Sequence, residues 1–224
     1  VVLPMPKDIP TDVTAIIGCA VMTGAGAIIN TLQVRPGQSV AVFGAGGIGL
    51  CAVAAAAIVD AYPIVAVDVS EEKLVFARRF GATHTVDARN VDAVKTIQDL
   101  SGGGVDYAID AVGLPETQEQ ILRAARMGYS GLNRGGTALL IGITPPGAKA
   151  ILDTNLFIGS RTFTRTSGGD CRPDRDFPLF VRWYRDGKLK LNDLVTRRYT
   201  LDQINSAVED LEHGRILGRG IITY

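Results

Sequence analysis

The chain has 224 residues, of which 46% are hydrophobic and 21% charged, and its 23 basic and 23 acidic residues give a formal net charge of zero. This composition is typical of a globular chain with room for one domain and part of another. A zero net charge gives no electrostatic basis for a nucleic-acid partner. The apolar stretch 48–59 is too short to span a bilayer, so we expect no membrane partner. Three scattered cysteines are too few for a disulfide framework, and we expect a cytoplasmic protein.

Short apolar runs alternate with helical stretches from residue 39 to about residue 143, which predicts a doubly wound, Rossmann-type parallel α/β sheet. The predicted strands, in chain order, are 39–43, 64–68, 83–86, 105–111 and 136–142. The predicted helices between them are 46–60, 70–81, 91–100 and 115–127. Beyond residue 147 the pattern predicts extended segments over 151–167, helices over 176–185 and 201–212, and a last strand over 220–224.

The first predicted strand runs directly into a Gly-x-Gly-x-x-Gly turn over 44–49 that opens a helix. In such a turn Gly44 makes the tight bend, Gly46 lets a pyrophosphate approach the backbone, and Gly49 lets the helix pack on the strand. Gly47 lies in the first helical turn, where free N–H groups face the phosphates. The whole pattern of strand, glycines and helix predicts a dinucleotide site.

Asp68 ends the second predicted strand, 19 residues after Gly49. A carboxylate at this place accepts hydrogen bonds from the adenosine ribose of NAD and repels the 2′-phosphate of NADP. The next residues, 69–72, include no arginine that could hold that phosphate. The sequence therefore favours NAD over NADP.

Two glycine-containing loops, 111–113 and 141–143, follow predicted strands and meet at the carboxyl edge of the sheet. Ligands of open parallel sheets lie across this edge. The loops, with Val112 and Gly142, either reach the nicotinamide half of the cofactor or are simple tight turns, and the pattern leaves both interpretations open.

A resemblance becomes visible when these motifs are taken together. The run 18–27, its spacing of 25 residues from Cys19 to Gly44, the pair Asp68 and Lys73, and the closing run 218–222 resemble the medium-chain zinc-dependent alcohol dehydrogenases over essentially the whole chain. The segments 80–86 and 169–178 are similar to the formaldehyde-dehydrogenase-like branch, which acts on thiol adducts.

The resemblance implies a role for each matching residue. Cys19 matches the last protein ligand of the catalytic zinc, and Thr23 matches a threonine beside the nicotinamide. The other matches are Ile48 behind the nicotinamide ring, Lys73 near the adenosine ribose, Val112 and Gly142 at the nicotinamide half, and Arg219 at the pyrophosphate. The implied cofactors are NAD and zinc.

The family's other zinc ligands and its proton-relay residue have no match in this sequence. One thiolate cannot hold a catalytic zinc, which takes three protein ligands. We therefore expect a fragment of a longer protein. The resemblance implies that 1–20 is a remnant of the GroES-like catalytic domain, 21–167 the NAD-binding domain, and 168–224 a segment that packs on the catalytic domain.

The function we expect is hydride transfer between a small alcohol or thiol hemiacetal and NAD by the complete, zinc-dependent enzyme. The fragment alone is expected to be inactive. A zinc-free quinone or enoyl reductase, a methyltransferase, and an NAD-binding module without activity are the alternatives. Family members form homodimers or homotetramers, and strands within 151–167 could pair across a twofold axis.

Overall fold

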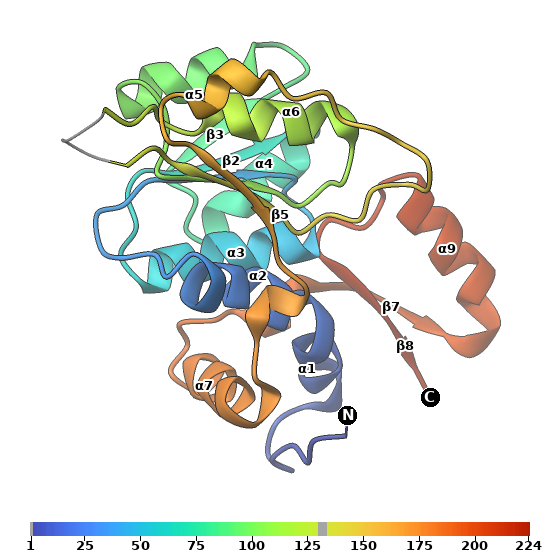
Figure 1. Ribbon diagram of the computed structural model, residues 1–224. Coiled ribbons are helices and arrows are strands. Elements are labelled where there is room, and N and C mark those ends of the chain that lie inside the picture. The colour runs from blue at the N-terminus through green and yellow to red at the C-terminus, as the bar shows by residue number, and fades with distance from the viewer. Residues whose placement is uncertain (1, 130–133) are drawn as a thin grey trace.

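The computed structural model describes residues 2–129 and 134–224, and a parallel sheet lies at its centre (Figure 1). Six strands are hydrogen-bonded in the order β3-β2-β1-β4-β5-β6, and each neighbouring pair is parallel. The strand order therefore runs outward in both directions from the junction of β1 and β4. Ligands of such sheets bind at this junction, where the strand order reverses. The strands are β1 (Val40–Phe43), β2 (Ile64–Asp68), β3 (His84–Asp87), β4 (Tyr107–Asp110), β5 (Thr137–Leu140) and β6 (Thr162–Arg165).

Helices cover both faces of the sheet, because successive side chains of each strand point to opposite faces. Val40 and Val42 pack with one apolar cluster, whereas Ala41 and Phe43 pack with the other. The first cluster includes side chains of α3 (Gly47–Ile58) and α4 (Glu71–Arg79), and the second includes those of α5 (Ala93–Ser101) and α6 (Pro115–Ala124). The expected doubly wound α/β fold is confirmed.

The predicted strands between residues 39 and 142 all form, with ends within two residues of those expected. The prediction for 151–167 was partly wrong. Only β6 is extended there, and Thr154–Phe157 forms a 3₁₀ turn because the Asp153 carboxylate accepts a hydrogen bond from the Asn155 N–H. β6 joins the edge of the sheet beside β5, so the parallel order continues beyond residue 143.

The C-terminal segment forms a second, smaller unit beside the sheet. It contains α7 (Pro173–Arg185), α8 (Leu191–Leu194), β7 (Val195–Thr200), α9 (Ile204–Glu212) and β8 (Arg219–Thr223). β7 and β8 pair in parallel, and Figure 1 shows them with α9 to one side of the main sheet. The predicted helices and last strand of this segment are confirmed, although α7 begins earlier, with Pro173 in its first turn.

A long apolar helix over residues 11–31 was not predicted. It alternates between α1 (Thr11–Ile16), a π turn η1 (Ile17–Val21), α2 (Met22–Gly26) and a second π turn η2 (Ala27–Thr31). Its length and composition would allow it to cross a membrane, but 56% of its most apolar window is buried inside the protein, as in a core helix. The expected domain boundary after residue 20 falls inside this helix.

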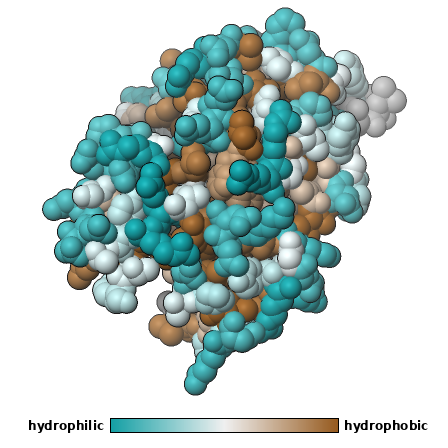
Figure 2. All heavy atoms as spheres, turned by 180° about the vertical axis from the view of Figure 1, so that it is seen from behind, coloured by the Kyte–Doolittle hydropathy of each residue, from teal (hydrophilic) through white to brown (hydrophobic). Residues whose placement is uncertain are grey.

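On the face of the molecule shown in Figure 2, polar side chains cover much of the surface, with apolar side chains between them.

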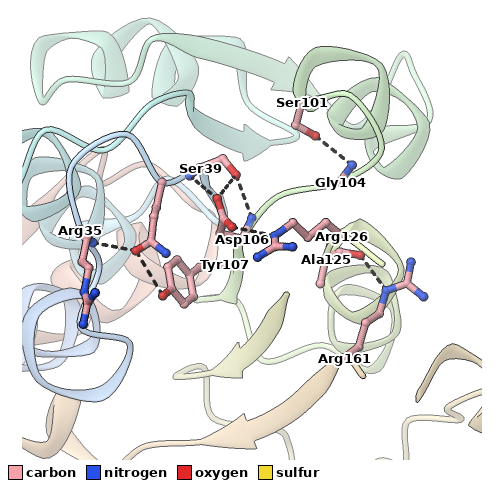
Figure 3. A network of polar contacts seen from close by, with 10 residues as sticks. Arg35, Ser39, Ser101, Gly104, Asp106, Tyr107, Ala125, Arg126 and Arg161 are labelled. Atoms are coloured by element: carbon pink, nitrogen blue, oxygen red, sulfur yellow. Dashed lines mark hydrogen bonds and ion pairs between the residues drawn. The ribbon is translucent and has the colours of Figure 1, made fainter. Parts of the chain in front are cut away.

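A polar network joins the amino ends of β1 and β4, on the edge opposite to the glycine-rich turn (Figure 3). The Asp106 carboxylate accepts hydrogen bonds from the Ser39 N–H (2.9 Å), the Ser39 hydroxyl (2.8 Å) and Arg126 Nε (2.7 Å). Burial alone would raise the pKa of Asp106, but these bonds outweigh it and hold the pKa below its ordinary value of 3.8. The network therefore stabilises the fold while Asp106 is ionised.

We predict that Asp106→Asn lowers the free energy of unfolding by about 2–3 kcal/mol near neutral pH, because a charged acceptor is lost. A lowered folded-state pKa contributes stability above the unfolded value, and this contribution is lost as the pH falls through the folded value. The difference between wild type and variant in urea unfolding should therefore shrink below about pH 4. A difference that stays constant with pH would contradict the assignment.

Candidate functional site

The turn after β1 depends on glycine at two positions. Gly44 has φ +96°, a conformation that L side chains rarely adopt. A Cβ on Gly49 would overlap the carbonyl oxygen of Gly44, so the first turn of α3 can lie against the end of β1 only without a side chain there. A Cβ on Gly46, in contrast, would meet no atom within 4 Å. Gly46 therefore lies beside open space at the mouth of the turn.

The N-terminus of α3 faces this open space. Gly46 is its N-cap residue, and no side chain caps the first turn. The free N–H groups of a helix N-terminus and the helix dipole together favour an anion. An uncapped helix N-terminus thus faces open space at residues 46–49, as an anion site requires.

Asp68 holds the turn in place from the end of β2. Its carboxylate accepts hydrogen bonds from the N–H groups of Ala45 (2.8 Å), Val69 (2.8 Å) and Ser70 (3.0 Å). A carboxylate offers about four acceptor sites, so acceptor capacity remains for a ligand hydroxyl. Ser70 also caps α4 by accepting from the Lys73 N–H, which places Lys73 in the first turn of that helix.

Arg219 reaches the same turn from β8, although it lies far from the turn in sequence. Its side chain covers Gly47: a Cβ on that glycine would come within 2.9 Å of three Arg219 atoms. Arg219 Nε is buried without a hydrogen-bond partner, and Nη2 lies 3.8 Å from the Cys19 sulfur. A buried cationic donor without an acceptor, next to a helix N-terminus, fits an anionic ligand.

Two clefts meet at the turn and share Gly46, Lys73 and Ala111. The first, the Asp68 cleft, has a volume of about 350 Å³, and Val112 lines it. The second, the Arg219 cleft, has a volume of about 410 Å³, and Ile48 lines it. The shared residues make the two clefts neighbours at the turn.

Cys19 and Thr23 lie on the long helix beside α3. Cys19 is exposed on the π turn η1, and Thr23 is half-buried at the start of α2. A Cβ on Gly24 would overlap the carbonyl oxygen of Ile48, so the two helices touch through their backbones at this glycine. This contact fixes Thr23 close to the first turn of α3.

The residues that the structure describes do not form a complete metal site. Within residues 2–129 and 134–224, no group of three His, Cys, Asp or Glu side chains could hold a metal ion. Burial raises the pKa of the Cys51 thiol to about 12, and burial with the nearby Asp176 carboxylate raises that of Cys171 to about 12. Cys51 is buried and the Cys171 thiol donates to the Met22 carbonyl oxygen, whereas Cys19 is exposed on η1, which makes Cys19 the candidate ligand.

Gly142 and Val112 lie in neighbouring loops that touch through their backbones. A Cβ on Gly142 would overlap the Gly113 N–H, and a Cβ on Gly44 would lie 2.7 Å from Val112 Cγ2. Sequence reasoning missed Asp110, which is buried between these loops. An acidic residue at the end of an apolar strand, directly before the loop 111–113, was the available signal.

The site can be compared with known proteins. The family described as zinc-binding dehydrogenase matches residues 47–186. The S-(hydroxymethyl)glutathione dehydrogenase of Paracoccus denitrificans is 33% identical over 97% of this chain and 58% of its own length. The geraniol dehydrogenase of Castellaniella defragrans is 34% identical over 94% of this chain and 55% of its own. The crystal structure of benzyl alcohol dehydrogenase from Acinetobacter calcoaceticus has a TM-score of 0.89 and 35% identity, and the match covers 97% of this chain and 58% of that one. This chain thus spans little more than half the length of these relatives.

The same substitution at Gly46 and at Gly49 should change the free energy of unfolding by very different amounts. Gly49→Ala forces the Gly44 backbone to move, and we expect a loss of about 3 kcal/mol or more in the free energy of unfolding. Gly46→Ala adds a methyl group to open space and should change it by less than about 1 kcal/mol. Urea unfolding followed by circular dichroism measures both. Equal losses in the two variants would contradict the geometry of the turn.

Proposed function

Because this chain belongs to the zinc-binding dehydrogenase family, we propose that it is the NAD-binding part of an alcohol dehydrogenase. The complete enzyme would transfer a hydride between NAD and an alcohol or thiol hemiacetal. The observation that carries this proposal is the convergence of an uncapped helix N-terminus, an unpartnered Arg219 Nε and the Asp68 carboxylate on one glycine-rich turn. Together they supply donors for a diphosphate and an acceptor for a ribose.

NAD would lie along the two clefts. The pyrophosphate would bind the N–H groups of Gly46 and Gly47 and the Arg219 guanidinium, and the adenosine ribose would bind Asp68 and Lys73. The position of Val112 in the Asp68 cleft supports a contact with the adenosine half, rather than with the nicotinamide half that the resemblance implied.

The nicotinamide half would extend towards Thr23, Ile48 and Gly142. Bound NAD supplies the hydride acceptor, and the protein supplies binding and orientation. The backbone contact at Gly24 supports this assignment, because it holds Thr23 next to the helix turn that carries Ile48.

Cys19 would be one ligand of the zinc ion in the complete protein. The described residues do not provide the further ligands that a catalytic zinc needs, so we derive no step through zinc for this chain. The proposed organisation keeps residues 1–20 and 168–224 with the catalytic domain and residues 21–167 with the NAD-binding domain. Alone, this chain would bind NAD without turning over an alcohol.

The names of the relatives support a substrate class for the complete enzyme. The relatives are named for S-(hydroxymethyl)glutathione, geraniol and benzyl alcohol, which share a primary alcohol carbon. We propose a primary alcohol or its thiol-adduct equivalent as substrate. A zinc-free quinone or enoyl reductase is the alternative, and metal analysis of the complete protein distinguishes it, because only the alcohol dehydrogenase contains a zinc bound by Cys19.

We also propose a homo-oligomer in the cytoplasm. β6 has β5 on one side and, among the described residues, no strand on the other, so a second copy could pair along this edge. The three cysteines are free, which suits a reducing compartment.

The preference for NAD can be tested by removing the charge of Asp68. Asp68→Asn should weaken NAD binding about tenfold and reduce the discrimination against NADP, because the repulsion of the 2′-phosphate is lost. Asp87→Asn is the matched control, since Asp87 lies at the paired register position of the neighbouring strand. Isothermal titration with both cofactors measures the effect. Equal affinity of the wild type for NAD and NADP, or equal affinities of the two variants, would contradict the role proposed for Asp68.

The phosphate approach can be tested at Gly46. Gly46→Ala should fold like wild type yet weaken NAD binding at least about tenfold, because its methyl group would occupy the space of the pyrophosphate. Titration with NAD checks this result. Unchanged affinity in the folded variant would show that the pyrophosphate does not lie there.

A further inference from the structure

Asp110 is a fully buried carboxylate at the end of β4. It accepts hydrogen bonds from the N–H groups of Val112 (3.0 Å) and Gly113 (3.0 Å) and from the Thr117 hydroxyl (2.9 Å). These donors come from the loop that follows Asp110 and from the first turn of α6. The carboxylate therefore folds loop 111–113 and the first turn of α6 around itself.

The backbone of Asp110 holds the next loop as well. Its carbonyl oxygen accepts hydrogen bonds from the N–H groups of Ile141 and Gly142, each at 2.9 Å. Gly113 has φ +92°, and a Cβ there would overlap the carbonyl oxygen of Ile143. Loops 111–113 and 141–143 are thus packed backbone to backbone, with Asp110 bonded to both.

The loop that Asp110 holds forms one wall of the Asp68 cleft. Val112, Leu114 and Thr117 line that cleft, together with Asp68 and Val69 at the end of β2. Asp110 does not line it. Its hydrogen bonds instead determine where the lining side chains lie relative to Asp68. A substitution of Asp110 would therefore affect ligand binding only by changing the position of the loop.

We propose that Asp110 is a positioning residue for the adenosine half of the dinucleotide, acting through loop 111–113. This inference rests on the proposed function. Without the carboxylate, the N–H groups of Val112 and Gly113 lose their acceptor, and the Thr117 hydroxyl keeps only its bond to the Leu114 carbonyl oxygen. The loop then occupies several positions, and a ligand has to order it when it binds, at a cost in affinity.

Asp106 provides a matched control on the same strand segment. Its carboxylate lies at the opposite end of β4. Like that of Asp110, it accepts hydrogen bonds from backbone and side-chain donors, here those of Ser39 and Arg126. It lines neither the Asp68 cleft nor the Arg219 cleft. A purely structural role for Asp110 predicts that alanine at either position affects ligand binding alike, whereas a positioning role predicts an effect at Asp110 only.

The experiment measures the dissociation constants of AMP and NAD by isothermal titration, at a temperature where circular dichroism shows each variant to be folded. For Asp110→Ala we expect both constants to rise about tenfold. For Asp106→Ala we expect both to stay within about twofold of wild type. Asp110→Asn restores one acceptor oxygen and should recover part of the affinity. Equal effects of the two alanine variants, or no effect of Asp110→Ala, would overturn the inference.

A second pair of variants covers the case in which Asp110→Ala does not fold. Thr117→Val removes one donor to the carboxylate, and Thr117→Ser keeps it. Because Thr117 also lines the Asp68 cleft, the two variants are compared with each other, and we expect the valine variant to bind AMP about threefold more weakly than the serine variant. Equal affinity of valine and serine variants would count against the inference. Failure of the wild-type protein to bind either AMP or NAD would refute the proposed function itself, a result distinct from a variant-specific failure.

Discussion

The contact between the backbones of Gly44 and Gly49 is the constraint on which the candidate site depends. It brings the first turn of α3 against the end of β1, so that the helix N-terminus points along the carboxyl edge of the sheet. The other groups are arranged around this turn: Asp68 binds its Ala45 N–H, and Arg219 covers Gly47. A side chain at Gly49 would separate helix and strand, and the donors and acceptors would no longer converge.

The site contains hydrogen-bond donors for which the described part of the chain provides no acceptor. Arg219 Nε is buried without a partner, and no side chain caps α3. Leaving such donors unsatisfied costs free energy, which the packing of the two apolar clusters on the faces of the sheet offsets. A bound anion would recover that cost, because the donors are already oriented towards it. The same arrangement is absent at the opposite edge, where Asp106, Ser39 and Arg126 satisfy one another.

Local sequence patterns predicted the sheet well, because strands buried on both faces read as continuous apolar runs and the glycine turn has a fixed spacing. They failed where structure depends on distant partners. The edge strand β6 has the weakly apolar sequence Thr-Phe-Thr-Arg and forms by pairing with β5. The position of Arg219 was implied by a family resemblance and by no local pattern, since Arg219 and Gly47 lie far apart in the sequence. Asp110 gave only the weak signal of an acid before a glycine loop.

The π turns of the long helix let its faces keep their direction although each turn holds an extra residue. Each π turn holds more residues than the 3.6 of an α-turn. Deleting one residue from Ile17–Val21 would therefore let the α-helix continue unbroken, with Val13 and Ile16 still directed at the core. The change would fall on the turn itself, where Cys19 lies beside Arg219. A one-residue change of chain length in this stretch would thus reposition the side chains of the turn and leave the packing before it in place.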